Sequence, residues 1–104
     1  MNKQDKEQLN ELTAFVESLK PFDNPLSTSM HGYIRITPDN KRKLFETYYG
    51  PGWRSILKPN VMTCGSCSLN AVKNIAIEYF AAITTIEQLQ SKNKNKKKDN
   101  NVEQ

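Results

Sequence analysis

Residues 63–91, which read TCGSCSLNAVKNIAIEYFAAITTIEQLQS, decide the fold of this 104-residue chain. Apolar side chains recur in this stretch at alternating steps of three and four residues, at Val72, Ile75, Tyr79, Ala82, Ile86 and Leu89. This spacing places them along one face of an α-helix, as in a coiled-coil seam. We therefore predict a single helix over about 64–91, capped by Thr63, with a length of about 40 Å at ~1.5 Å per residue.

This helix is longer than a compact domain of this size needs. Ala76 and Ile83 widen its apolar stripe beyond a pure seam. Two arrangements fit the pattern. Either the C-terminal half of the helix projects and meets another chain, or the whole helix packs on the first helix of the same chain.

Two shorter helices are expected upstream. Residues 4–20 are amphipathic and end at Pro21, because proline cannot continue the helical hydrogen bonds. Residues 38–49 follow Thr37 as N-cap and stop at Gly50. We expect an irregular packed loop over 21–36, with a short extended segment at 33–36, and one helical turn within 53–58. The predicted fold is mainly α, a small three-helix domain over residues 1–91 with a long C-terminal helix and a basic tail.

The composition bounds the size of the core and the range of functions. Only 37% of the residues are hydrophobic, and 104 residues leave room for one modest core but not for a large catalytic cleft. The net charge of +4 is concentrated in residues 21–63 and 92–104. Residues 92–104 form a low-complexity Lys/Asn tail, which we expect to be disordered on its own.

The chain shows no signal peptide and no apolar run of the ~20 residues that a bilayer requires. We expect no membrane association and a protein made in the cytoplasm, where thiols stay reduced.

Cys64 and Cys67 form the one motif in the sequence whose side chains could carry out redox chemistry or bind a metal. At a helix N-terminus the thiol pKa is lowered, which favours redox chemistry, but no strand precedes Cys64 as it does in thioredoxin-like sites. Zinc requires four ligands, so His31 and a carboxylate such as Asp23 or Asp39 would have to join the pair, or a second chain would supply a matching pair. The third interpretation, which we favour, is that both cysteines pack as small apolar side chains. We therefore expect no cofactor, with zinc as the alternative.

No nucleophile motif, phosphate-binding loop or acid pair is present, so an enzyme is not expected. Basic residues interleaved with aromatic ones can instead bind single-stranded nucleic acid by charge and stacking, although a helix with one core face and one wet face has the same pattern. The nucleic-acid candidates are Arg35, Lys41, Arg42, Lys43, Arg54, Lys58, Lys92, Lys94, Lys96, Lys97 and Lys98. The candidates for contact with a protein partner are Tyr48, Tyr49, Trp53, Val72, Ile75, Tyr79, Ile83, Ile86 and Leu89.

From Tyr48-Tyr49-Gly50 to Thr63-Cys64-Gly65-Ser66-Cys67, the chain resembles short uncharacterised proteins of tailed bacteriophages, including the crAss-like group. In these a Thr-Cys-x-x-Cys opens a final helix after a turn containing glycine and aromatic residues. The resemblance covers about residues 44–80 and implies no functional residue. The Lys/Asn-rich composition agrees with an AT-rich phage genome.

These observations predict a non-enzymatic, structural or auxiliary protein of a phage virion. Its partners would be larger capsid or portal subunits or copies of itself. One alternative is a small nucleic-acid-binding accessory protein that uses residues 35–58 and the Lys tail. Another is a zinc-linked dimer through Cys64 and Cys67.

Overall fold

The computed structural model describes the backbone of residues 2–102 and the side chains of residues 2–91. The described residues form helices and connecting turns without a strand, which confirms the mainly α prediction. The α-helices are α1 (Lys3–Leu19), α2 (Asp23–Ser29), α3 (Pro38–Tyr49), α4 (Trp53–Ile56) and α5 (Gly65–Val102), with 3₁₀ turns at Lys20–Phe22 and Pro59–Met62.

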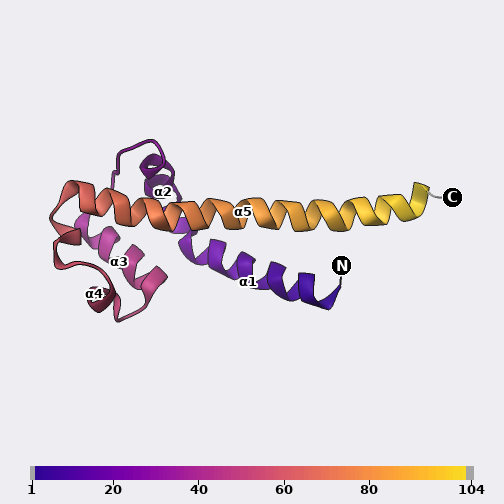
Figure 1. The fold of residues 1–104 in the computed structure, drawn as a ribbon, viewed down its shortest axis with the longest axis horizontal. Coiled ribbons are helices and arrows are strands. Elements are labelled where there is room, and N and C mark those ends of the chain that lie inside the picture. The colour runs from indigo at the N-terminus through magenta and orange to yellow at the C-terminus, as the bar shows by residue number, and fades with distance from the viewer. Residues whose placement is uncertain (1, 103–104) are drawn as a thin grey trace.

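Helix α5 is the element on which the others are arranged (Figure 1). It spans the long axis of the molecule, and α1 runs antiparallel beside it. In this view α2 lies on one side of the N-terminal half of α5, while α3 and α4 lie on the other. The expected three helices are therefore present, and two short helices join them.

The hydrophobic core lies where the N-terminal half of α5 meets α2, α3 and α4. Within it the ring of Phe45 of α3 packs against that of Trp53 of α4, with ring centroids 5.5 Å apart. The core residues are Leu19, Leu26, Leu44, Phe45, Trp53, Val61, Ala71, Val72, Ile75, Ala76 and Tyr79. The apolar stripe predicted for the last helix thus supplies four of these eleven core residues.

The prediction of an irregular loop over residues 21–36 is wrong for residues 23–29, which form α2. Pro25 is compatible with this helix because it lies in the first turn of α2, where a backbone N–H has no helical partner to lose. The buried Ser29 hydroxyl donates to the Leu26 carbonyl at 2.7 Å, so this polar group is satisfied inside the core. After α2 the chain crosses residues 33–37 without helix, as expected for a short extended segment.

The ends of α3 agree with the sequence. The Thr37 hydroxyl accepts from the Asn40 N–H at 3.2 Å, and Pro38 stands at the first helical position. At the other end Gly50 has φ +90°, which favours glycine, and its N–H donates to the Glu46 carbonyl at 2.8 Å.

The ends of α5 differ from the expected 64–91. Thr63 is not its cap, because it ends the preceding 3₁₀ turn and its hydroxyl donates back to the Asn60 carbonyl. At the other end the helix continues to Val102, since neither proline nor glycine follows residue 91 and lysine is a good helix former. The side chains of the tail over residues 92–104 lie outside the described part.

The molecule is elongated. Its extents are 62 × 27 × 18 Å, and its radius of gyration is 17.4 Å. A compact chain of this length has a radius of gyration of about 13 Å. No helix in the described part has the length and apolarity to cross a membrane.

Replacement of Phe45 by alanine tests the core. Phe45 is fully buried, so Phe45→Ala leaves a cavity and should lower the free energy of unfolding by about 3–5 kcal/mol. Ile77 is half exposed on α5, so the control Ile77→Ala should change the free energy of unfolding by no more than about 0.5 kcal/mol. Urea unfolding followed by circular dichroism measures both; equal losses would contradict the assigned core.

Tyr79 makes the fold sensitive to alkali. Burial, and then the hydrogen bond that its hydroxyl donates to Asp23 at 2.9 Å, raise its pKa to about 12. Between its ordinary pKa of 10.0 and this value, the phenol ionises only in the unfolded chain, so the free energy of unfolding should fall as pH rises through this window. Tyr79→Phe should show a smaller fall in the same titration. An equal fall in both proteins would contradict this role.

Candidate functional site

The two cysteines lie at the start of α5, and Cys64 occupies the N-cap position expected for Thr63. The Cys67 N–H donates to Cys64 Sγ at 3.3 Å, and Ser66 Oγ lies 3.4 Å from the same sulfur. The Ser68 N–H donates to the Cys64 carbonyl at 2.9 Å, which begins the helical hydrogen bonds. Cys64 therefore caps α5 through its sulfur, as serine does through its oxygen at such positions.

Neither cysteine belongs to the buried core, so the packing interpretation of the motif is not supported. Both side chains are partly exposed, and both thiols are free. The residue that α5 buries at this point is Ser68. Ser68 is bonded to the Val61 carbonyl and to Lys41, so this end of the helix is positioned by hydrogen bonds as well as by apolar contact.

The two thiols differ in acidity. The hydrogen bond from the Cys67 thiol, followed by those from the Ser66 hydroxyl and the Cys67 N–H, lowers the pKa of Cys64 to about 7. The pKa of Cys67 is raised, first because its own thiol proton is held by Cys64, although the Lys58 ammonium acts in the opposite direction. Cys64 is therefore the thiol that ionises first.

Ser68 fixes the turn that carries the thiols. Its hydroxyl donates to the Val61 carbonyl and accepts from the Lys41 ammonium, whose Nζ lies 3.0 Å away. Through these contacts the first turn of α5 is joined to the Pro59–Met62 turn and to α3. Lys41 thus serves the fold, because its ammonium is held by Ser68 at the start of α5.

The described residues do not assemble a zinc site within one chain. Among the described residues, no three or more His, Cys, Asp and Glu side chains lie close enough together to hold a metal ion. His31 is exposed after α2 and belongs to no such group with Cys64 and Cys67. A matching pair of cysteines from a second chain remains the form in which zinc fits this motif.

The aromatic residues of α3 and α4 do not form an exposed stacking platform for nucleic acid. Phe45 and Trp53 are buried in the core, and the half-buried Tyr48 donates its hydroxyl to Glu78. Arg54 lies over the Trp53 ring, 4.5 Å from its centroid. A surface hollow of about 290 Å³ gathers three candidate cations but also two acids, lined by Asp39, Arg42, Lys43, Glu46, Pro51, Trp53 and Arg54. Asp39 pairs with Arg42, which further reduces the positive charge there.

The remaining nucleic-acid candidates are dispersed. Arg35 lies in the extended segment and Lys58 just before the second 3₁₀ turn; both are exposed. Lys92, Lys94, Lys96, Lys97 and Lys98 lie in the stretch whose side chains are outside the described residues.

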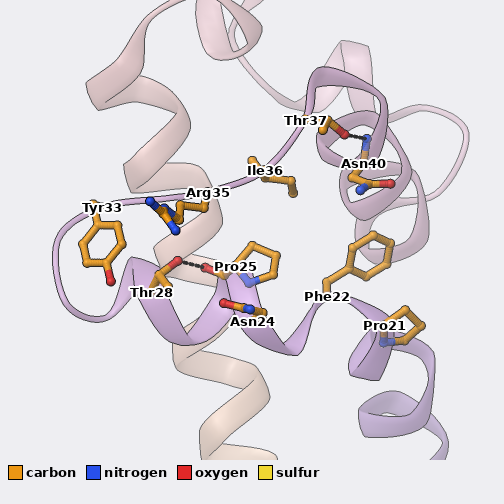
Figure 2. Close-up of a pocket in the computed structure, with 10 residues that line it drawn as sticks. All are labelled: Pro21, Phe22, Asn24, Pro25, Thr28, Tyr33, Arg35, Ile36, Thr37 and Asn40. Carbon is orange, nitrogen blue, oxygen red and sulfur yellow. Dashed lines mark hydrogen bonds between the residues drawn. The ribbon is translucent and has the colours of Figure 1, made fainter.

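A groove between α2 and the extended segment was not anticipated from the sequence (Figure 2). Its volume is about 700 Å³, and the figure shows Tyr33 and Arg35 at one end and Phe22 and Asn40 at the other. Alternation along residues 33–36 was the available signal, since Ile34 and Ile36 pack on the core while Tyr33 and Arg35 are exposed. The lining residues are Pro21, Phe22, Asn24, Pro25, Thr28, Tyr33, Arg35, Ile36, Thr37 and Asn40.

The residues predicted to contact a partner separate into two groups. Trp53, Val72, Ile75 and Tyr79 are at most 5% exposed and are used by the chain's own core, so they are unavailable to another protein. Tyr48, Tyr49, Ile83, Ile86 and Leu89 are half-buried.

The last two of these residues belong to a row that continues past the core. We call the half-buried residues Leu9 and Leu12 of α1, together with Ile86 and Leu89 of α5, the distal row. They stand on two helices that contact each other. None of the four is part of the core or of the partly buried shell around it.

Comparison with known proteins identifies no relative. No family model matches the chain, and neither a curated protein nor a solved structure is significantly similar to it. Function is therefore inferred from the residues and their geometry.

The Cys64 cap predicts a pH dependence of stability. Because the folded-state pKa is about 7 against an ordinary 9.0, the thiolate stabilises the fold fully above pH 9, and this contribution is lost as pH falls through 7. Wild type should therefore gain stability from pH 7 to pH 9 relative to Cys64→Ser. Thermal unfolding at several pH values measures the difference, and parallel curves for the two proteins would contradict it.

Proposed function

We propose that the chain is a non-enzymatic, protein-binding component of a phage particle that docks on a larger capsid or portal subunit through the distal row. The observation that carries this proposal is the half-buried apolar row Leu9, Leu12, Ile86 and Leu89, which extends beyond the core on a pair of helices.

Two helices alone cannot bury such a row. An amphipathic helix carries an apolar stripe at least about 100° wide, and a single neighbour covers only part of it. At the core end of α5, α2 and the Pro59–Met62 turn contact the helix in addition to α1, and the residues of the stripe there are almost fully buried. At the distal end α1 is the helix that pairs with α5 among the described elements, and the side chains stay half-buried. A helix or sheet of a partner placed along the pair would complete their burial.

The elongated shape supports the same conclusion. The radius of gyration of 17.4 Å reflects the length of α5, and Figure 1 shows α1 and α5 extending side by side past α2, α3 and α4. A projecting pair of helices can bind a neighbour along its long side with little free energy spent on conformational change, because no backbone rearrangement is needed. The chain can therefore bind as a preformed unit.

The assignment to a phage particle is supported by the resemblance carried by Tyr48-Tyr49-Gly50 and Thr63–Cys67, and by the Lys/Asn-rich composition. A small adhesive protein with a basic C-terminal tail suits a particle in which protein subunits and packaged DNA lie side by side.

The distal row provides the test. The double variant Ile86→Glu/Leu89→Glu places two charges in the proposed contact and should weaken binding by well over tenfold, since burial of even one unpaired charge costs more than the ~1.4 kcal/mol that a factor of ten represents. In particles purified after infection, mass spectrometry should find the wild-type chain and much less of the double variant. Ile77→Glu, at a half-exposed site on the same helix, is the matched control and should be incorporated normally.

Absence of the wild-type chain from purified particles, or equal incorporation of the double variant, would overturn the proposal. Circular dichroism of each variant establishes that the helices are retained. Sedimentation of the purified chain at increasing concentration distinguishes a larger partner from a second copy, because only a second copy makes the apparent mass rise.

The nucleic-acid alternative is less well supported by the geometry, because Lys41 is bonded to Ser68 and acids accompany Arg42, Lys43 and Arg54. Binding to DNA or RNA at low salt that weakens steeply as salt is raised would restore it. Native mass spectrometry showing a metal-containing dimer would instead favour the zinc-linked alternative.

A further inference from the structure

The Cys64–Cys67 pair has three properties of a reactive dithiol. These are the only cysteines of the chain, and both are partly exposed. The two residues lie in one turn, where the Cys67 N–H donates to Cys64 Sγ at 3.3 Å. Gly65 between them is exposed, and apart from its chain neighbours and the backbone of its own helix no heavy atom lies within 4 Å of the place where its side chain would begin. A reagent can therefore reach the turn that carries both thiols.

The environment makes the two sulfurs unequal. Cys64 Sγ is the acceptor for the Cys67 N–H at 3.3 Å and has Ser66 Oγ at 3.4 Å, and it stands at the positive end of a long helix. Hydrogen bonds and a helix N-terminus favour the thiolate, which is the nucleophilic form of cysteine. The neighbouring Cys64 raises the pKa of Cys67, so Cys67 keeps its proton while Cys64 is ionised.

We propose that this pair is a thiol–disulfide exchange site whose substrates are low-molecular-weight disulfides, with Cys64 as the attacking sulfur and Cys67 as the resolving sulfur. The site does not depend on the docking function proposed above, because the thiols and the distal row lie at different parts of α5.

The exchange proceeds in two balanced steps. In the first, the Cys64 thiolate attacks one sulfur of a disulfide RSSR, a new S–S bond forms to Cys64, and RS⁻ leaves. In the second, Cys67 loses its proton to the released RS⁻ and attacks Cys64 Sγ, which expels a second RS⁻. The chain is oxidised by two electrons to the Cys64–Cys67 disulfide, and RSSR is reduced to one RSH and one RS⁻, which takes up a proton from water.

The fold favours the reduced form of the pair. A thiolate at Cys64 accepts the hydrogen bonds that cap α5, whereas a disulfide sulfur is a much weaker acceptor. Stabilisation of the reduced form makes the corresponding disulfide more oxidising and easier to reduce. The site therefore suits reversible exchange better than a permanent structural crosslink.

Oxidised glutathione tests the proposal on the full-length reduced chain. Samples are quenched with acid at intervals and analysed by intact-mass spectrometry. Wild type should lose two hydrogens as the internal disulfide forms, without accumulating the glutathione adduct. Cys67→Ser should stop at one glutathione on Cys64, because the resolving thiol is missing.

Cys64→Ser is the matched control. At pH 7 its remaining thiol should react more slowly than that of Cys67→Ser, since the larger thiolate fraction of Cys64 outweighs the lower intrinsic nucleophilicity of a more acidic thiol. The rate for Cys67→Ser should level off at a lower pH than the rate for Cys64→Ser, because the Ser66 hydroxyl and the backbone N–H at position 67 still lie against Cys64 Sγ.

Equal rates and equal pH profiles for the two single variants would overturn the assignment of roles. Accumulation of glutathione adducts on the wild type without ring closure would overturn the exchange site itself. Retention of the helical circular dichroism spectrum by both variants is the control for folding. The two overturning results concern the thiols alone and do not bear on whether the chain is found in phage particles.

Discussion

Burial of one face of α5 is the constraint on which the rest of the structure depends. Val72, Ile75 and Ala76 have no exposed surface, and the short helices are placed where they cover these side chains. At roughly 25 cal/mol per Å² of apolar surface removed from water, such burial is the main favourable term in a core of this size. Polar contacts then fix the arrangement, as Tyr79 donates to Asp23 and Lys41 donates to Ser68.

The same helix has a different environment along each part of its length. Its first turn presents two thiols, its next turns form the core, and its distal part shares a half-buried apolar row with α1. From Cys67 to Ile86 the rise of the helix is about 28 Å. The dithiol and the docking surface are therefore separate, and chemistry at one need not disturb contact at the other.

The capping role of Cys64 explains why the motif is more than two small side chains. A helix begins with N–H groups that lack helical partners, and here a sulfur accepts one of them. The contact that stabilises the start of α5 also favours the thiolate. The stability of the helix start and the reactivity of Cys64 thus have the same physical origin. From the spacing of the two cysteines alone, redox chemistry was only one of three interpretations.

Much of the fold was determined by local sequence. The 3–4 spacing along residues 72–89 predicts the long helix, and Thr37, Pro38 and Gly50 predict α3 exactly as it is found, because periodicity and caps depend on near neighbours. The spacing of apolar residues does not determine which element of the fold covers the apolar face of a helix. Tertiary packing decided that Val72 and Ile75 belong to the core while Ile86 and Leu89 stay half-buried, since α2 and the Pro59–Met62 turn contact only the first part of α5. It also decided that the thiols stay accessible and that Lys41 is bonded, because both depend on the distant residues brought to the start of that helix.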